Sequence, residues 1–160
     1  MCIRDSLHFA SKEDVVISHV DRIVDRLCER MEQIAGRDEA AAVRLKAMLI
    51  ERVVFRLKAV QHYTEALNDV AAGIRPKLLE RRAEHFAREA RLLQRVLTEG
   101  RRNGELGDAG PATTARALIE ATNALLPYSL SPQELGDVAD VRRRVSIIAD
   151  LLVGGLRNAS

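Results

Sequence analysis

The sequence predicts an all-α protein, and three observations lead to that class. Only 3% of the 160 residues are aromatic, and tryptophan is absent. The chain is rich in alanine, leucine, arginine and glutamate, which are strong helix formers. Apolar residues recur at three- and four-residue intervals, whereas strand-like alternation with period two does not occur. We therefore expect a single bundle of five to six helices around one hydrophobic core.

Composition and charge exclude several classes of protein. The chain has 25 basic and 23 acidic side chains, a net charge of +2, so it is not a polycation built to coat nucleic acid. Cys2 and Cys28 are too few for a disulfide framework and do not have zinc-ligand spacing. The apolar runs are far shorter than the roughly 20 residues that cross a bilayer. We expect a cytoplasmic protein with no membrane partner and no cofactor.

The first long helix is predicted to begin at Ser11, whose hydroxyl can cap the free amides of a helix start. Gly36 is a typical residue for its end. Between them lies one apolar stripe with helical spacing, made of Val16, Val20, Ile23, Leu27, Met31 and Ile34.

The second helix is predicted to open at Arg37 or Asp38 and to break near Tyr63. A short helix over Glu65–Ala72 should stop at Gly73, and Pro76 should begin a third long helix that ends at Thr98–Gly100. The apolar positions of the two long helices are Val43, Ala47, Ile50, Val54 and Leu57, then Leu79, Ala83, Phe86, Ala90, Leu93 and Leu97.

Two further helices complete the predicted bundle. Gly104, Gly107 and Gly110 make residues 101–110 a loop, which one more helical turn could precede, because glycine lowers helix stability. A helix should then run from Pro111 to Pro127, and a last one should start at about Val138. The chain shows no internal domain boundary.

Two stretches of the sequence resemble the TetR family of transcription repressors. Leu7–Val15, which reads LHFASKEDV, is similar to the junction between the recognition helix and the fourth helix of that family. Val96–Leu106 and Ala115–Leu125 are similar to its turn from the seventh into the eighth helix. The resemblance implies that the predicted helices correspond to the family's fourth to ninth.

The resemblance also implies a division of function along the chain. Residues 1–10 are expected to be a non-native start plus a remnant of the DNA-reading helix-turn-helix, and residues 11–160 an effector-binding and dimerisation domain. The intact parent would be a ligand-responsive repressor that binds operator DNA. This chain would sense a small, largely apolar effector and form a homodimer. By resemblance, His8 and Lys12 would contact DNA phosphates, although Lys12 can equally be an ordinary surface lysine.

The middle helices are where the resemblance places the effector pocket. The break near Tyr63 could supply a hydrogen-bonding group inside an apolar cavity, whereas the aromatic residues could also be plain core. A buried asparagine needs a polar partner in either case. The candidate pocket residues are Phe55, His62, Tyr63, Phe86 and Asn123.

Arg81 and Arg82 lie in a stretch of alternating charge with Glu80 and Glu84. Such a pattern most often forms a solvated helix face with ion pairs four residues apart. The alternative interpretation is that one arginine turns inward to meet an acidic effector.

The last two helices are predicted to form the dimer interface, because small and apolar side chains allow helices to approach closely around a two-fold axis. The glycines near the end of the last helix could instead indicate fraying. The candidate interface residues are Leu118, Thr122, Leu125, Ile148, Leu151, Leu152 and Gly155.

Catalytic and metal-binding motifs are absent from the sequence. It contains no His-Glu-x-x-His, no glycine-rich phosphate loop and no nucleophile elbow. His62 and Glu65 form a single His-x-x-Glu pair, which would need metal ligands from elsewhere. We therefore do not expect an enzyme. The competing interpretations are a helical-bundle metal protein or enzyme and a pure protein-interaction module.

Overall fold

In the computed structural model, which describes residues 11–61, 64–127 and 132–158, every regular element is helical, as predicted. The connections between the helices are short. The helices are α2 (Lys12–Ala35), α3 (Ala41–Gln61), α4 (Thr64–Arg102), α5 (Pro111–Thr122), α6 (Pro132–Leu135) and α7 (Val138–Asn158), with a 3₁₀ turn η1 (Asn123–Leu125) after α5.

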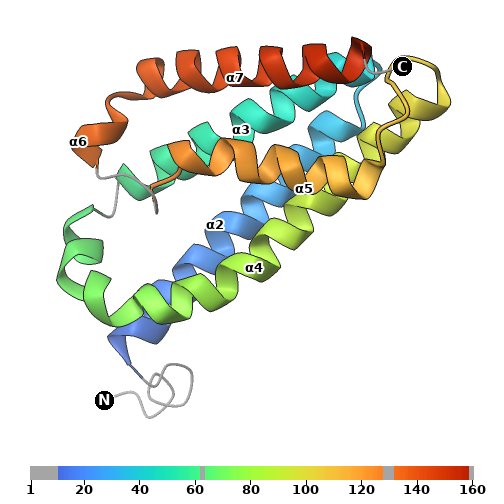
Figure 1. The fold of residues 1–160 in the computed structure, drawn as a ribbon. Helices are drawn as coiled ribbons and strands as arrows, with labels where there is room; N and C mark the ends of the chain where they lie inside the picture. The colour runs from blue at the N-terminus through green and yellow to red at the C-terminus, as the bar shows by residue number, and fades with distance from the viewer. Residues whose placement is uncertain (1–10, 62–63, 128–131, 159–160) are drawn as a thin grey trace.

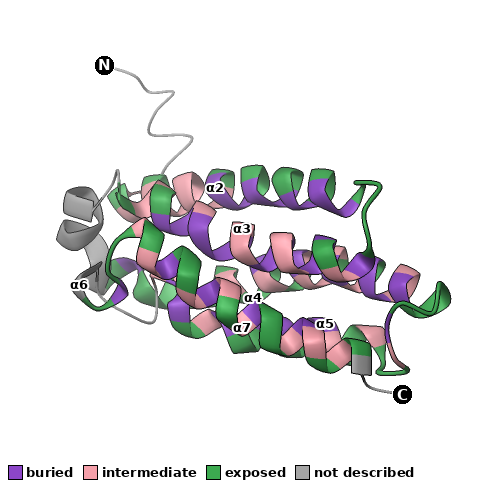
Figure 2. Cartoon of the chain, turned by 90° about the horizontal axis from the view of Figure 1, so that it is seen from above, coloured by how far each residue is buried: buried purple, intermediate pink, exposed green. Residues whose placement is uncertain are grey.

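The helices pair in two layers with α5 between them (Figure 1). α2 and α4 pack along each other, and α3 packs along α7. α5 lies against α4 and is flanked by α3 and α7. Figure 2 shows that buried residues follow the inward sides of these helices while exposed residues cover the outside.

The predicted start and end of α2 are confirmed. The Ser11 side chain accepts a hydrogen bond from the Asp14 amide at 3.2 Å, and the Gly36 amide donates to the Glu32 carbonyl. In the predicted stripe, Val16 and Val20 are half-buried and the following members are buried: Ile23, Leu27, Met31 and Ile34.

α3 begins at Ala41, three residues later than the predicted Asp38. The Ala41 amide donates to Glu105 Oε2 at 2.7 Å, so a side chain from the distant 101–110 loop satisfies a free amide at the helix start. A helix start capped in this way leaves no local signal of the kind that Ser11 provides.

α4 corrects the prediction of a short helix followed by a long one. It runs without interruption through Gly73 and Pro76, and Figure 1 shows its axis bent near its start. Pro76 removes one backbone hydrogen bond and normally bends a helix rather than ending it when packing holds both sides.

The carboxyl end of α4 also passes the predicted stop at Gly100. A Cβ atom at Gly100 would lie 2.6 Å from Leu106 Cδ1 and 2.7 Å from Ala41 Cβ. Glycine is required there for close packing, and the helix continues to Arg102.

Two adjoining clusters form the core. The larger joins α2, α3, α4, α5 and α7, and the smaller joins the second half of α3 to η1, α6 and the first half of α7. Phe86 packs against both. Three predicted apolar positions are exposed rather than in the core: Val43 at 52%, Leu79 at 43%, and Ala83.

Candidate functional site

Two arginines of α3, Arg52 and Arg56, are buried in the interior together with Glu89 of α4. The exposed fractions of their side chains are 0%, 2% and 0%. Arg52 Nε lies 2.7 Å from Glu89 Oε2, and Arg56 Nη2 pairs with Glu89 Oε1. One carboxylate therefore serves two guanidinium groups where water cannot solvate them.

Arg52 extends this contact to a third helix. Its Nη1 donates to Thr122 Oγ1 and its Nη2 to Asn123 Oδ1, both at 2.7 Å. Thr122 Oγ1 in turn donates to the Leu118 carbonyl at 2.9 Å. We call Arg52, Arg56, Glu89, Thr122 and Asn123 the buried arginine network. It joins α3, α4 and the end of α5 at one point.

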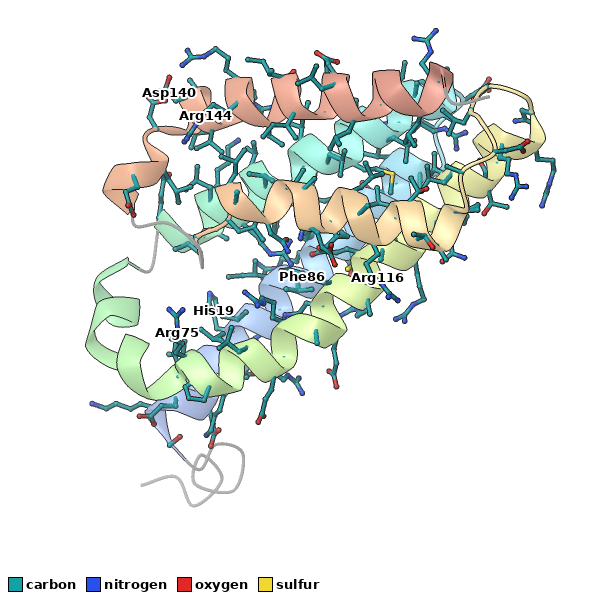
Figure 3. The ribbon with its side chains drawn as sticks, in the orientation of Figure 1. His19, Arg75, Phe86, Arg116, Asp140 and Arg144 are labelled. Atoms are coloured by element: carbon teal, nitrogen blue, oxygen red, sulfur yellow. The ribbon has the colours of Figure 1, made fainter. Side chains whose placement is uncertain are left out.

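Phe86 lies beside this network, on the side of α4 that faces α3 and α5 (Figure 3). The Cζ atoms of three arginines lie close to the centre of its ring: Arg52 at 4.9 Å, Arg56 at 5.6 Å and Arg82 at 5.6 Å. Guanidinium groups at such distances are attracted to the electron-rich face of an aromatic ring.

The structure brings together two of the five predicted pocket residues. Phe86 and Asn123 both contact Arg52. Phe55 is separate from them, because its ring packs beside Arg30 of α2, with a distance of 5.2 Å from Arg30 Cζ to the ring centre. His62 and Tyr63 lie outside the described residues.

Sequence reasoning missed Arg52, Arg56 and Glu89, because charged residues are normally assigned to the solvated face of a helix. The one usable signal is their spacing. Arg52 and Arg56 are four residues apart and share a face of α3 with buried Val53 and Leu57.

A ladder of ion pairs connects α2 to α4 on the outside of the bundle. Every acid belongs to α2 and every base to α4. The pairs are Asp14–Lys77, Asp21–Arg81, Asp21–His85, Asp25–Arg88 and Glu32–Arg95, and we call them the α2–α4 ladder.

Asp21 is the most enclosed acid of the ladder. It lies 2.8 Å from His85 Nε2 and 2.5 Å from Arg81 Nη2. Burial alone would raise the pKa of the Asp21 carboxyl, but hydrogen bonds from Arg81 and His85 outweigh it and hold the pKa below its usual value.

His19 on α2 has a half-buried side chain, and Figure 3 shows it on the same side of the α2–α4 pair as Arg75. Burial lowers the pKa of its imidazole, and the positive charges of Arg22 and Arg26 lower it further. The neutral ring is therefore favoured at pH 7. Of the two predicted DNA-backbone contacts, Lys12 is exposed at the first residue of α2, and His8 lies outside the described residues.

The predicted dimer interface stays a prediction, but its members differ in exposure. Leu118, Thr122 and Leu125 are buried inside the chain and offer little surface to a second copy. Ile148 and Leu152 are half-buried against the core, whereas Leu151 and Gly155 are exposed.

The exposed face of α7 carries the largest solvent-accessible apolar side chains of the described residues. Leu151 is 73% exposed and Ile147 is 55% exposed. Ala117 and Ala121 of α5 and Ala124 of η1 are also exposed. Exposed apolar surface that forms a continuous patch marks sites of contact with other proteins.

The described part of the chain has neither a cluster of metal ligands nor a helix that could span a membrane. No group of three or more His, Cys, Asp or Glu side chains there is arranged to hold a metal ion. No helix in the described ranges combines the length and apolarity needed to cross a bilayer.

The bundle and its helix order define a class of fold that occurs among transcription regulators. A crystal structure of a transcriptional regulator of the TetR/AcrR family from Thermobifida fusca matches 91% of this chain and 75% of that chain, with a TM-score of 0.63 and 25% sequence identity. No protein-family model and no curated protein sequence matches. The chain therefore has the TetR/AcrR family fold, which confirms the resemblance to that family.

Proposed function

We propose that residues 11–160 form the effector-sensing and dimerising domain of a ligand-responsive transcription repressor. The observation that carries the proposal is the structural match to a TetR/AcrR regulator along 91% of the chain. Binding of operator DNA is proposed for the intact regulator rather than for these residues.

The proposed homodimer uses the exposed faces of α5 and α7. In a two-fold dimer the same surface is contributed twice, so the surface must be complementary to itself. Ile147 and Leu151 of α7 can pack against the exposed alanines of the partner's α5, because alanine lets helices approach closely. Gly155 continues this face, and the half-buried Ile148 and Leu152 flank it.

The proposed mechanism is a shift between two positions of α2. A ligand that binds one arrangement of the helices more tightly raises the population of that arrangement. α2 packs along α4, which also carries Phe86, so a change at Phe86 can reach α2 through one helix. In the intact repressor, movement of α2 at its Lys12 end would change the spacing of the DNA-reading domains.

The dimer is tested by sedimentation of the chain and of the Leu151→Arg variant. The chain should sediment as a dimer, and Leu151→Arg should raise the dissociation constant at least about a hundredfold, since about 1.5–3 kcal/mol of leucine burial is lost on each side of the axis.

Leu79→Arg is the matched control, because Leu79 is an exposed leucine on α4, away from the proposed interface. This variant should remain a dimer. A wild-type chain that sediments as a monomer at high micromolar concentration contradicts the proposal, and so does equal weakening by the two variants.

A further inference from the structure

The neighbouring arginines Arg81 and Arg82 turn to different sides of α4. Arg81 faces outward, where its Nη2 pairs with Asp21 of α2. Arg82 faces the Phe86 ring, with 5.6 Å between Arg82 Cζ and the ring centre. Consecutive helix residues differ by about 100° in direction, so the two side chains meet different surroundings. Arg81 therefore lies on the charged outer face, and Arg82 turns toward Phe86; an acidic effector at Arg82 stays a prediction.

Four charged side chains that the structure describes at or next to Phe86 carry more positive than negative charge. Arg52, Arg56 and Arg82 contribute three cations and Glu89 one anion, a formal sum of +2 for these four groups. Arg52 and Arg56 share Glu89. Within the ranges that the structure describes, no carboxylate forms an ion pair with Arg82.

Part of this charged cluster can be reached from outside. Arg52, Arg56 and Glu89 are buried, but Arg82 and Phe86 are only half-buried. A charge near a buried cluster is screened less than one in open water, because the surrounding protein has a lower dielectric constant. An anion at the Arg82–Phe86 edge would therefore interact with all three guanidinium groups.

We propose that the effector is an anion, a small carboxylic acid whose carboxylate pairs with Arg82 and whose apolar body lies along Phe86. This inference rests on the proposed function and names the chemical class of its effector. A carboxylate matches the planar fork of a guanidinium with two parallel hydrogen bonds. Phe86 also touches both core clusters, so an apolar body has apolar neighbours on either side.

The test compares each acid with a neutral molecule of similar shape. Benzoate with benzamide, and octanoate with octan-1-ol, are titrated into the full chain by calorimetry at low and high ionic strength. We expect at least one acid of the panel to bind about tenfold or more tightly than its neutral counterpart, and to lose affinity as salt is added.

The variants Arg82→Gln and Arg81→Gln form a matched pair, since they change the same residue type at adjacent positions. Arg82→Gln should weaken binding of the acid about tenfold or more, whereas Arg81→Gln should leave it unchanged. Thermal unfolding of both variants serves as the folding control, and Arg82→Lys should restore part of the affinity through its positive charge.

Three results would overturn the anion site. The first is that an acid and its neutral counterpart bind equally tightly, and the second is that Arg82→Gln and Arg81→Gln weaken binding equally. The third is that no acid of the panel binds at 10 mM, which is about tenfold above a dissociation constant in the weak millimolar range. If the chain still dimerises through α7, such a result removes the anion site and leaves the proposed regulator. A monomeric chain with Arg82-dependent binding would contradict the proposed dimer and keep the anion site.

Discussion

The α2–α4 ladder and the buried arginine network use the same types of side chain in opposite environments. In the ladder, each acid on α2 meets a base on α4 at the surface; Asp25 and Arg88, for example, have side chains 56% and 40% exposed. In the network, Arg52 and Glu89 are fully buried. The ladder spreads its charges along two helices, whereas the network concentrates three charges at the junction of α3, α4 and α5.

This difference predicts different energetic roles. Exposed ion pairs contribute little, because water already solvates both partners. A buried pair has lost that solvation, and removing one partner leaves an uncompensated charge in the interior. The ladder should therefore tune the contact between α2 and α4, while the network is required for the fold.

The largest effect is expected for Glu89→Gln. The substitution leaves Arg52 and Arg56 without the carboxylate that they share, which should lower the free energy of unfolding by about 3–5 kcal/mol. Urea unfolding measures this loss. Glu84→Gln is the control on the same helix, because the Glu84 side chain is 72% exposed, and it should change stability by less than about 0.5 kcal/mol.

A smaller effect is expected for Asp21→Asn, the most enclosed position of the ladder. Loss of the charged acceptor for Arg81 and His85 should cost about 1–2 kcal/mol at pH 7. The pKa of Asp21 is lower in the folded chain than its usual value. Its stabilisation is therefore complete above the unfolded pKa of about 3.9 and is lost as the pH falls through the folded pKa.

Unfolding of wild type and Asp21→Asn at several pH values measures this dependence. The stability difference between them should shrink as the pH falls below about 4. A difference that does not shrink there would contradict the lowered pKa of Asp21 in the folded chain.

The smallest effect is expected for Asp25→Asn, which removes an exposed pair with Arg88. The cost should be about 0.2–1 kcal/mol at low salt and should vanish in 1 M NaCl, where charges are screened within about 3 Å. The double variant Asp25→Arg with Arg88→Asp exchanges the two charges, and it should recover most of the free energy of unfolding that the single substitution loses. A large, salt-independent cost would place this pair with the buried network instead.

Local signals predicted some elements well. The ends of α2 were predictable because Ser11 and Gly36 act on residues within one turn of themselves. α7 begins at Val138 as expected, after Gly136 with its positive φ of 81°. In both cases the information that fixes the helix end lies beside it in the sequence.

The sequence-based predictions were wrong where contacts between residues far apart in the sequence determine the bounds of a helix or the burial of a side chain. Pro76 and Gly73 would each end an isolated helix, but α4 packs along α2 and remains continuous. Arg52 and Arg56 look like surface residues until Glu89, more than 30 residues later, is folded against them. Periodicity separates polar from apolar residues, but it does not identify a polar residue whose partner is buried with it.

The candidate site likewise combines residues that the sequence indicates with residues that only long-range packing reveals. Phe86 and Asn123 were proposed as pocket residues from residue type and the family resemblance, and both contact Arg52, which no sequence motif marks. The two faces of α5 are hard to tell apart from the sequence, because alanine and threonine occur on both. Only the position of α5 between α4 and α7 distinguishes them.

The hydrogen bond from Ala41 to Glu105 has a consequence for the order in which the chain acquires its structure during synthesis. The first turn of α3 lacks this partner until the ribosome has added 64 further residues. Gly100 and Leu106, which pack against Ala41, arrive at the same late stage, as does Glu99, the partner of Arg44. A growing chain that ends before residue 105 therefore carries α3 with an unfinished start, and the end of α4 and its loop complete that start before α5 and α7 are added to the bundle.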